Sequence, residues 1–261
     1  MNSETFVFID TEHQTNVTTG VLPTYSFGSE GFYDVEIGLV NPNIIDISFE
    51  GTPLISIEIG ANVLYIGDDA FRNCSSLTSV TIPDSVTTIG YYAFYGCSSL
   101  TSVNIPSGVT TMNMGAFEHC SSLKRVYISD IVAWCNISFE DTYSNPLKNG
   151  CDLYLNNELV TDLTIPNITS IPYAAFCGCT SLTSVTIPDS VISMSWYTFG
   201  YCPNLTSITC YATTAPSITP KTFYQMLKGG TLYVPTGSDY SSWMSTNSFY
   251  LGKYNWTSQE I

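Results

Sequence analysis

One apolar pattern recurs along this chain with a fixed spacing of 23 residues. Leucine, phenylalanine and cysteine each return at that interval, at Leu54, Leu77, Leu100 and Leu123, at Phe71, Phe94 and Phe117, and at Cys74, Cys97 and Cys120. The same positions return later at Val160, Phe176 and Cys179, and at Leu182, Phe199 and Cys202. Five copies are therefore nearly complete: 54–76, 77–99, 100–122, 160–181 and 182–204. A fixed period of this length is typical of repeat architectures, in which each copy forms one coil of a stack.

The copy at residues 77–99 shows how one coil is expected to run. Residues 80–82 alternate as in a short strand, and Pro83 ends that strand because it has no N–H to donate to a ladder. Residues 86–89 supply a second short inward segment, and residues 93–97 are predicted to close the coil as a helical turn. A single coil has too few inward side chains to offset the entropy of ordering its backbone, so the coils must stack.

The full pattern reads Leu-x-x-Val-x-Ile-Pro-x-x-Val-x-x-Ile-Gly-x-x-Ala-Phe-x-x-Cys and, with one interruption, covers residues 54–204. It resembles the BspA-like bacterial leucine-rich repeats. We therefore expect an α/β, β-rich fold: a right-handed leucine-rich-repeat solenoid of short parallel strands with about 23 residues per coil, capped at both ends. The resemblance implies a cell-surface or secreted protein that adheres to host, matrix or other bacterial molecules, and it implies no catalytic residues.

Three parts are expected along the chain. Residues 1–53 do not fit the repeat and are predicted to form an N-terminal cap, because an uncovered first coil would leave an unpaired strand edge. Residues 54–205 are predicted to form the solenoid. Residues 206–261 are predicted to form the C-terminal cap.

Residues 129–159 are predicted to be an insertion, because the interval from Leu123 to Val160 is 37 residues, 14 more than one repeat. A short helix capped by Ser129 is expected to contain Trp134, and Asn156-Asn157 is expected to form a tight hairpin turn. Two interpretations stay open. Insertions in repeats often mark a functional face, or this one is a structural plug in which Trp134 packs against a neighbouring coil.

The charge of the chain limits its partners. Acidic residues outnumber basic residues by 22 to 7, and the formal net charge is −15. Seven basic residues cannot form the footprint that nucleic-acid binding needs, and an anionic membrane is disfavoured for the same reason. No segment approaches the roughly 18 apolar residues of a membrane span, and no signal peptide is visible at the N-terminus.

The localisation and the oligomeric state are expectations of the same kind. The chain is either intracellular or has lost a leader peptide. We expect an extracellular or cell-surface location, with the leader outside this sequence. Charged residues make up only 11% of the chain, and a polar but uncharged composition is a weak indication in the same direction. We expect a monomer.

Of the nine cysteines, the five of the repeat are predicted to be free, whereas Cys135, Cys151, Cys177 and Cys210 are left as possible sites of oxidation or pairing. Five occupy the Phe-x-x-Cys position, namely Cys74, Cys97, Cys120, Cys179 and Cys202. Equivalent side chains of stacked coils point in parallel, which disfavours the dihedral angle of a disulfide, and cysteine packs well as a small buried residue. No Cys or His pair has zinc spacing, and no nucleophile or phosphate-binding motif appears. We therefore expect no metal, no cofactor and no enzyme activity, although acidic pairs such as Asp68-Asp69 leave a paired-carboxylate glycosidase as an alternative.

One position tests the local geometry of the coil. It follows the second inward segment and holds Gly67, Gly90, Asn113, Pro172 and Ser195 in the five copies. Glycine alone would suggest a positive φ, but the ring of Pro172 fixes φ near about −65°. A compact residue is therefore predicted here for close packing.

The outward positions of the first strand are the predicted binding face. Most of them carry small hydroxylic side chains, and the exception is Arg125 with Tyr127 beside the insertion, the residue types that dominate binding energy. The candidate partner-binding residues are Glu58, Asn104, Arg125, Tyr127, Trp134 and Asp162.

A second, aromatic stripe lies elsewhere on the coil, at Tyr91, Tyr92, Tyr173, Trp196 and Tyr197. These rings either pack against adjacent coils, which we favour, or bind glycans or other partners. The sequence thus predicts a non-catalytic recognition or adhesion module that binds a protein or another macromolecule through the solenoid face. A glycan-binding or carbohydrate-active surface protein is the first alternative, and a structural spacer is the second.

Overall fold

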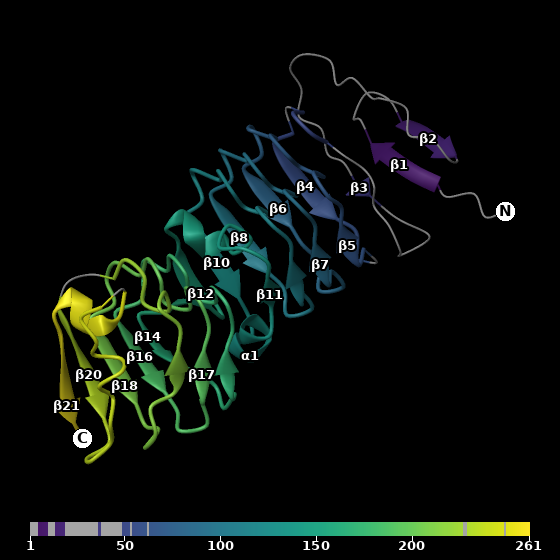
Figure 1. The fold of residues 1–261 in the computed structure, drawn as a ribbon. Coiled ribbons are helices and arrows are strands. Elements are labelled where there is room, and N and C mark those ends of the chain that lie inside the picture. The colour runs from purple at the N-terminus through teal and green to yellow at the C-terminus, as the bar shows by residue number, and fades with distance from the viewer. Residues whose placement is uncertain are drawn as a thin grey trace.

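The computed structural model describes strands at residues 5–9, 14–18 and 36–37, and residues 49–261 apart from 53, 62, 227, 228 and 248. Figure 1 shows a stack of coils that runs along the molecule. Each regular coil gives one strand to a first sheet, a shorter strand to a second sheet, and a turn that closes the coil. The predicted solenoid of short parallel strands, with about 23 residues per coil, is confirmed.

The first sheet has three sections, in which adjacent strands are parallel except for β12 and β13. Parallel pairing follows from the coil, since each turn of the chain returns in the same direction one step further along the stack. In bonding order the sections are β3 (Glu36–Ile37), β4 (Ser56–Ile59) and β6 (Ser79–Thr81); β8 (Ser102–Ile105), β10 (Arg125–Ile128), β12 (Asp152–Leu155) and β13 (Glu158–Leu159); and β14 (Asp162–Thr164), β16 (Ser184–Ile187), β18 (Ser207–Cys210), β20 (Gly230–Val234) and β21 (Trp256–Glu260).

The second sheet has two sections of shorter strands, all parallel. They are β5 (Tyr65–Ile66), β7 (Thr88–Ile89), β9 (Thr111–Met112) and β11 (Ser138–Phe139), and then β15 (Ser170–Ile171), β17 (Ser193–Met194) and β19 (Ser217–Ile218). Near the N-terminus, β1 (Thr5–Ile9) and β2 (Gln14–Thr18) form a separate antiparallel pair. Most of the predicted N-terminal cap lies outside the described residues.

Strand alternation sorts the side chains of the first sheet. In β8, Val103 and Ile105 are buried in the core, whereas Asn104 is exposed on the outer face. The same alternation holds along the first sheet because successive side chains of a strand point to opposite faces. The inward residues of all the coils from Phe49 to Trp256 form one core cluster.

The turn that closes each coil is not helical, so this prediction is wrong. Tyr92 and Gly96 have left-handed backbones, with φ of 53° and 71°, and the matching positions of other coils are left-handed too. These residues turn the backbone N–H groups toward the next coil: Tyr92 N donates to Met114 O and Gly96 N to Glu118 O. A helix would use those N–H groups within its own turns, whereas here they bind one coil to the next.

Phenylalanine and cysteine line the inner side of these turns. The ring centroids of Phe71 and Phe94 lie 5.2 Å apart, as do those of Phe94 and Phe117, and both pairs are stacked. Cys97 Sγ donates to Phe71 O at 3.1 Å, and Cys120 Sγ donates to Phe94 O at 3.1 Å. The five cysteines of the repeat are free and buried, as predicted, and the other four cysteines are free and buried too.

The compact position after the second strand is explained by close packing. Gly90 does not have a positive φ, as the proline in the same position of another coil required. A Cβ atom on Gly90 would lie 2.8 Å from both Asp68 N and Gly67 C of the preceding coil. The prediction for this position is confirmed.

Residues 129–159 build one enlarged coil. Helix α1 (Ile131–Cys135) begins after Asp130, whose carboxylate accepts hydrogen bonds from Val132 N at 2.7 Å and Ala133 N at 3.1 Å. The helix is thus confirmed, but its cap is Asp130 and not Ser129. Strand β11 then pairs with β9, a short 3-10 helix η1 (Pro146–Asn149) follows, and β12 returns to pair with β10.

The regular stacking stops after this coil. Asn156 and Asn157 are left-handed, with φ of 52° and 67°, and they form the predicted hairpin turn between β12 and β13. Strand β13 bonds to the edge of β12, and the next strand, β14, begins a new section of the sheet. We call residues 49–155 the N-terminal block and residues 161–261 the C-terminal block.

The chain ends with two further parallel strands, β20 and β21, and a second 3-10 helix η2 (Leu251–Tyr254). Between them, two buried aromatic side chains bond to backbone carbonyls of earlier coils. Tyr240 Oη donates to Ala212 O at 2.7 Å, and Trp243 Nε1 donates to Pro216 O at 2.9 Å. These rings fill the end of the core.

Candidate functional site

Strand register brings four outward side chains into one row beside the hairpin. Asn104 pairs with Tyr127, Tyr127 pairs with Tyr154, and Tyr154 pairs with Leu159 across β8, β10, β12 and β13. Residues paired in register share a face of the sheet, so these side chains lie next to one another. Arg125 lies two residues before Tyr127 on the same face of β10. We call Arg125, Tyr127, Tyr154 and Leu159 the tyrosine patch.

The two tyrosines form the centre of the patch. Their ring centroids lie 4.8 Å apart with an interplanar angle of 31°, and both side chains are half-buried. Leu159 is 46% exposed on the two-residue strand β13. The patch therefore offers two adjacent rings and an aliphatic side chain on an open sheet, where nothing in the described chain covers them.

Two residues of opposite charge lie side by side on β10 and β12, two positions before the tyrosines. Arg125 is exposed and is paired in register with Asp152. The Asp152 carboxylate accepts a hydrogen bond from Thr180 Oγ1 at 2.7 Å, and among the described residues no carboxylate oxygen lies within 4.0 Å of the Arg125 guanidinium. The guanidinium is thus available to a partner beside the rings.

The other predicted residues are spread along the same face. Glu58 is exposed on β4, in the first section of the sheet, and Asn104 is exposed on β8 at the end of the patch row. Asp162 is exposed on β14, beyond the hairpin. Its carboxylate accepts hydrogen bonds from Ser184 and Thr161, which lower its pKa in that order. The structure therefore brings Asn104, Arg125 and Tyr127 together, but not Glu58 or Asp162.

Trp134 is not part of a binding surface, and its inclusion among the candidate residues is corrected. Its side chain is 1% exposed. The indole Nε1 donates to Ala175 O at 2.9 Å, and the ring packs against Phe139 with a centroid separation of 5.4 Å. An apolar ring with a single polar N–H is stable in such a place because the N–H has a partner. Of the two interpretations of the insertion, the packing one describes Trp134.

Two members of the patch are not among the residues predicted from the sequence. Tyr154 and Leu159 come from the segment outside the regular repeat. The run Cys151-Asp-Leu-Tyr-Leu155 has the same alternation as Arg125-Val-Tyr-Ile128, and that likeness was the available signal. Leu159 had no signal, since its position depends on the hairpin pairing.

The aromatic stripe of the turns is partly packed and partly exposed. Tyr92 lies under the Arg72 guanidinium, 5.4 Å from the ring centroid, and Tyr173 meets Tyr197 edge to face at 6.1 Å. Tyr91 is 39% exposed and Trp196 is 42% exposed. Packing therefore accounts for the inner rings, while the outer rings remain accessible.

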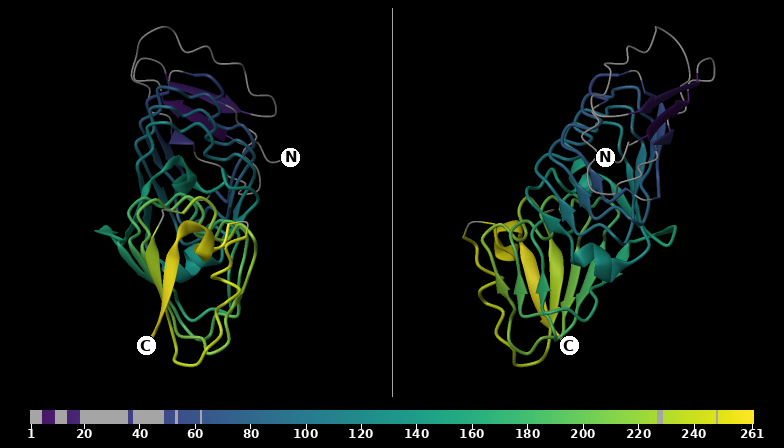
Figure 2. Two further views of the ribbon diagram at one scale, coloured as in Figure 1. Left: turned by 60° about the vertical axis from the view of Figure 1, so that its left-hand side comes forward. Right: turned by 90° about the vertical axis from the view of Figure 1, so that its right-hand side faces the viewer.

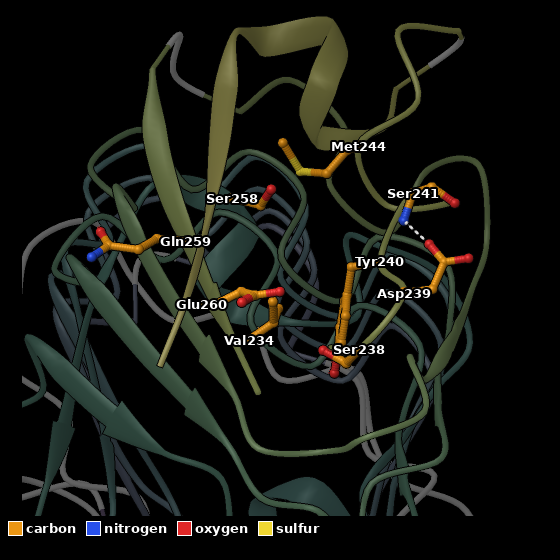
Figure 3. A pocket seen from close by; sticks show the side chains of 9 residues that line it. All are labelled: Val234, Ser238, Asp239, Tyr240, Ser241, Met244, Ser258, Gln259 and Glu260. Carbon is orange, nitrogen blue, oxygen red and sulfur yellow. Dashed lines mark hydrogen bonds between the residues drawn. The ribbon is translucent and has the colours of Figure 1, made fainter. Parts of the chain in front are cut away.

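A hollow of about 290 Å³ lies at the C-terminal end (Figure 3). The two carboxylates that line it accept hydrogen bonds from backbone N–H groups: Asp239 from Ser241 N at 2.9 Å, and Glu260 from Gly237 N at 3.1 Å. The Ser241 backbone and side chain lower the pKa of Asp239, whereas a general acid needs a raised pKa. The paired-carboxylate alternative thus finds no support at this hollow.

The hollow marks the end of the core. On β21, Ser258 and Glu260 are in register with the buried Leu232 and Val234 of β20, and Figure 3 shows Ser258 and Glu260 pointing into the hollow while Gln259 points away. Polar side chains thus replace apolar ones at the inward positions. We propose on this basis that residues 206–261 act as a C-terminal cap.

Two properties of the described residues concern membranes and metals. No helix among them is long and apolar enough to cross a bilayer. Within the same residues, no group of three or more His, Cys, Asp or Glu side chains is arranged to hold a metal ion.

Comparison with known proteins gives one family match. The model of the BspA type leucine-rich repeat region matches six copies over residues 42–146 and 150–254. No curated protein matches the chain.

Solved structures of bacterial leucine-rich repeat proteins are similar to the chain at low identity. The leucine-rich repeat protein of T. pallidum is 23% identical, with 69% of this chain and 73% of that chain covered and a TM-score of 0.38. A leucine-rich repeat protein of Eubacterium ventriosum is 16% identical, with 100% and 83% covered and a TM-score of 0.36. A leucine-rich cell surface protein of Faecalibacterium prausnitzii is 20% identical, with 100% and 93% covered and a TM-score of 0.33.

Proposed function

The chain belongs to the BspA-type leucine-rich-repeat family, and from that premise we propose that it is a non-catalytic recognition module that binds another protein through its strand face. The tyrosine patch carries this proposal. Tyrosine and arginine are enriched among the residues that dominate binding energy at protein interfaces. Here two tyrosines and an exposed leucine lie beside an arginine that has no carboxylate partner among the described residues, on a face where most other side chains are small and hydroxylic.

The setting of the patch suits a partner surface. Strand β13 ends a section of the sheet, and residues 156–159 are all exposed. A short hairpin stands out from the side of the stack in both views of Figure 2. A partner that rests on the tyrosines would therefore also contact the hairpin, which increases the buried area without any change in the solenoid.

The location and assembly state complete the proposal. We infer a cell-surface or secreted adhesion protein that acts as a monomer. The family resemblance and the low share of charged residues, 11%, support the location.

The experiment compares two tyrosine variants on the same sheet. Arrays of purified extracellular proteins and of glycans are probed with the full chain, and the tightest protein ligand is then titrated by calorimetry. The double variant Tyr127→Ala/Tyr154→Ala should bind that ligand about thirtyfold more weakly, the loss of a central interface anchor. The control is Tyr233→Ala, which removes a half-buried tyrosine from the outer face of β20, and it should bind as the parent does.

Thermal unfolding of each variant checks that the solenoid is intact. A double variant that binds the ligand as tightly as the parent would reject the patch. Binding to glycans but to no protein would reject a protein partner. The absence of any binding on both arrays at millimolar concentration would favour a structural spacer.

A further inference from the structure

A row of aromatic rings and lysines lies on the turn side of the coils, away from the tyrosine patch, and it joins the end of the N-terminal block to the C-terminal block. Tyr201 and Tyr224 meet with ring centroids 5.2 Å apart, and Tyr197 lies 5.5 Å from Tyr224. Lys148 and Lys221 sit at the two ends of this group. We call the row formed by Tyr143, Lys148, Tyr201, Tyr197, Lys221 and Trp196 the lysine–aromatic row.

Both ammonium groups lie over ring faces. Lys148 Nζ is 3.7 Å from the centroid of Tyr201 and 5.2 Å from that of Tyr143. Lys221 Nζ is 5.4 Å from the centroid of Tyr197 and 5.8 Å from that of Trp196. The negative face of the rings attracts each ammonium group. Cation–π contacts therefore hold the two lysines in this row, in the place of ion pairs with carboxylates.

Among the residues that the structure describes, the two lysines of the row lack the acidic partners that the composition of this chain would favour. The sequence has 22 acidic and only 7 basic residues, so a lysine has many acids with which to pair. Yet within the described residues no carboxylate oxygen lies within 4.0 Å of Lys148 or Lys221. Asp141 lies close enough to the neighbouring Tyr173 for its charge to contribute, after burial, to the raised pKa of that tyrosine, and its Oδ1 already accepts from Ser144 N and Gly115 N. The hydrogen bond to the Tyr197 side chain raises the pKa of Lys221, so Lys221 is held by a phenol and not by an acid. Neither ammonium group has a carboxylate partner among the described residues, so each can pair with an anion from outside.

The ends of the row are accessible. Trp196 is 42% exposed and Tyr143 is 40% exposed. The lysine side chains are flexible, so an ammonium group can leave a ring and reach an anion while the ring face becomes available to an apolar surface. The row thus offers flat apolar faces and positive charge at the same place.

We propose that the lysine–aromatic row binds an acidic oligosaccharide. The C–H faces of the sugar rings stack on Trp196 and Tyr143, and uronic carboxylates accept hydrogen bonds from Lys148 and Lys221. An extended peptide fits this side poorly, because it would need free backbone groups to pair with. Here the turn N–H groups already bond to the next coil, as Tyr197 N does to Lys221 O and Tyr201 N to Tyr224 O.

The test is a titration of the full chain with three probes: a short galacturonic acid oligosaccharide, the neutral galactose oligosaccharide of the same length, and a poly-glutamate peptide. Binding is measured by calorimetry and by tryptophan fluorescence. Trp196 is the accessible one of the four tryptophans, since the other three are at most 4% exposed. The acidic sugar should bind and quench that fluorescence, and added salt should weaken the binding because it screens exposed charges.

Matched charge variants give the decisive comparison. Lys148→Gln and Lys221→Gln should each weaken binding of the acidic sugar about tenfold, the loss of one charged hydrogen bond. Lys124→Gln removes the same charge next to β10 and should leave the affinity unchanged. The neutral sugar should bind at least about tenfold more weakly than the acidic one for the same reason.

The outcomes separate this proposal from that for the tyrosine patch, since the two concern different faces. No binding of the acidic sugar, equal binding of the neutral sugar, equal binding of poly-glutamate, or an equal loss in Lys124→Gln would each overturn the lysine–aromatic row. The Tyr127→Ala/Tyr154→Ala variant should bind the acidic sugar as the parent does.

Discussion

Buried thiols are the residues whose chemistry most affects the stability of this chain. Four of the five ladder cysteines, all but Cys179, donate to a carbonyl of the preceding coil, as Cys97 Sγ does at 3.1 Å from Phe71 O. A thiol can donate there, but a thiolate would face a carbonyl oxygen in an apolar interior. Burial raises the pKa of Cys120, Cys135, Cys151 and Cys177 to about 12.

This shift predicts loss of stability in alkali. In the unfolded chain a thiol releases its proton near about pH 8.5, whereas the folded chain keeps it. The folded state therefore binds more protons, and the free energy of unfolding falls as the pH rises from about 9 to about 12, by about 1.4 kcal/mol per pH unit for each such thiol. Below pH 8 the contribution is fully present. Urea unfolding at a series of pH values measures the slope.

Single replacements test the assignment to the thiols. Cys177→Ala and Cys177→Ser should both make that slope shallower by about 1.4 kcal/mol per pH unit, whatever their effect at pH 7. An unchanged slope in both variants would contradict the prediction.

At the scale of elements, the left-handed turns decide how closely the coils approach. Gly178 belongs to such a turn, with φ of 83°, and it faces η1. A Cβ atom there would lie 2.5 Å from Leu147 O and 2.8 Å from the Lys148 Cα. Both atoms are backbone, so neither can move aside without shifting η1.

Gly178→Ala should therefore be far more costly than an ordinary glycine replacement. A left-handed alanine alone costs about 1–2 kcal/mol, and overpacking adds about 1–3 kcal/mol. Gly237→Ala is the control, because Gly237 has φ of 75° and nothing lies within 4 Å of the added Cβ. Chemical denaturation of the two variants separates strain from contact, and equal costs would show that η1 does not press on Gly178.

The repeat could be predicted from the sequence because each position of a coil has the same surroundings in every copy. Val80, Phe94 and Cys97 occupy the same places as their counterparts one period away, so their burial follows from spacing alone. The turn conformation did not follow from the pattern, since the left-handed positions hold residues as different as Tyr92 and Gly115. There the hydrogen bonds to the next coil override local preference.

The candidate site was half predictable for a related reason. Arg125 and Tyr127 lie within a regular strand, and alternation places them outward. Tyr154 lies beside Tyr127 only because the chain returns after α1, β11 and η1 to pair β12 with β10. Such a pairing depends on tertiary packing, and local sequence does not encode it.

At the scale of the whole molecule, one core spans a break in the stacking. The stacked phenylalanines run from Phe49 to Phe117 and start again at Phe176. Trp134 and Leu147 of the enlarged coil are buried in the same core cluster. The two blocks therefore share a core although both sheets are interrupted between them.

Trp134 should be the side chain that most strengthens this junction. Trp134→Phe keeps much of the ring but removes the hydrogen bond to Ala175 O, and we expect a loss of about 1–3 kcal/mol in the free energy of unfolding. Val132→Ala, on the exposed side of α1, should change it by less than about 0.5 kcal/mol. Equal effects of the two variants, measured by urea unfolding, would mean that the indole does not hold the blocks together.

The single irregular coil gives the array a fixed reference point. Regular coils are interchangeable units, so gaining or losing one on either arm moves everything beyond it by one strand spacing, about 4.8 Å. The hairpin and its neighbouring rings would keep their geometry through such changes. The distance from the hairpin to each end of the molecule can therefore change during evolution in whole steps of one coil.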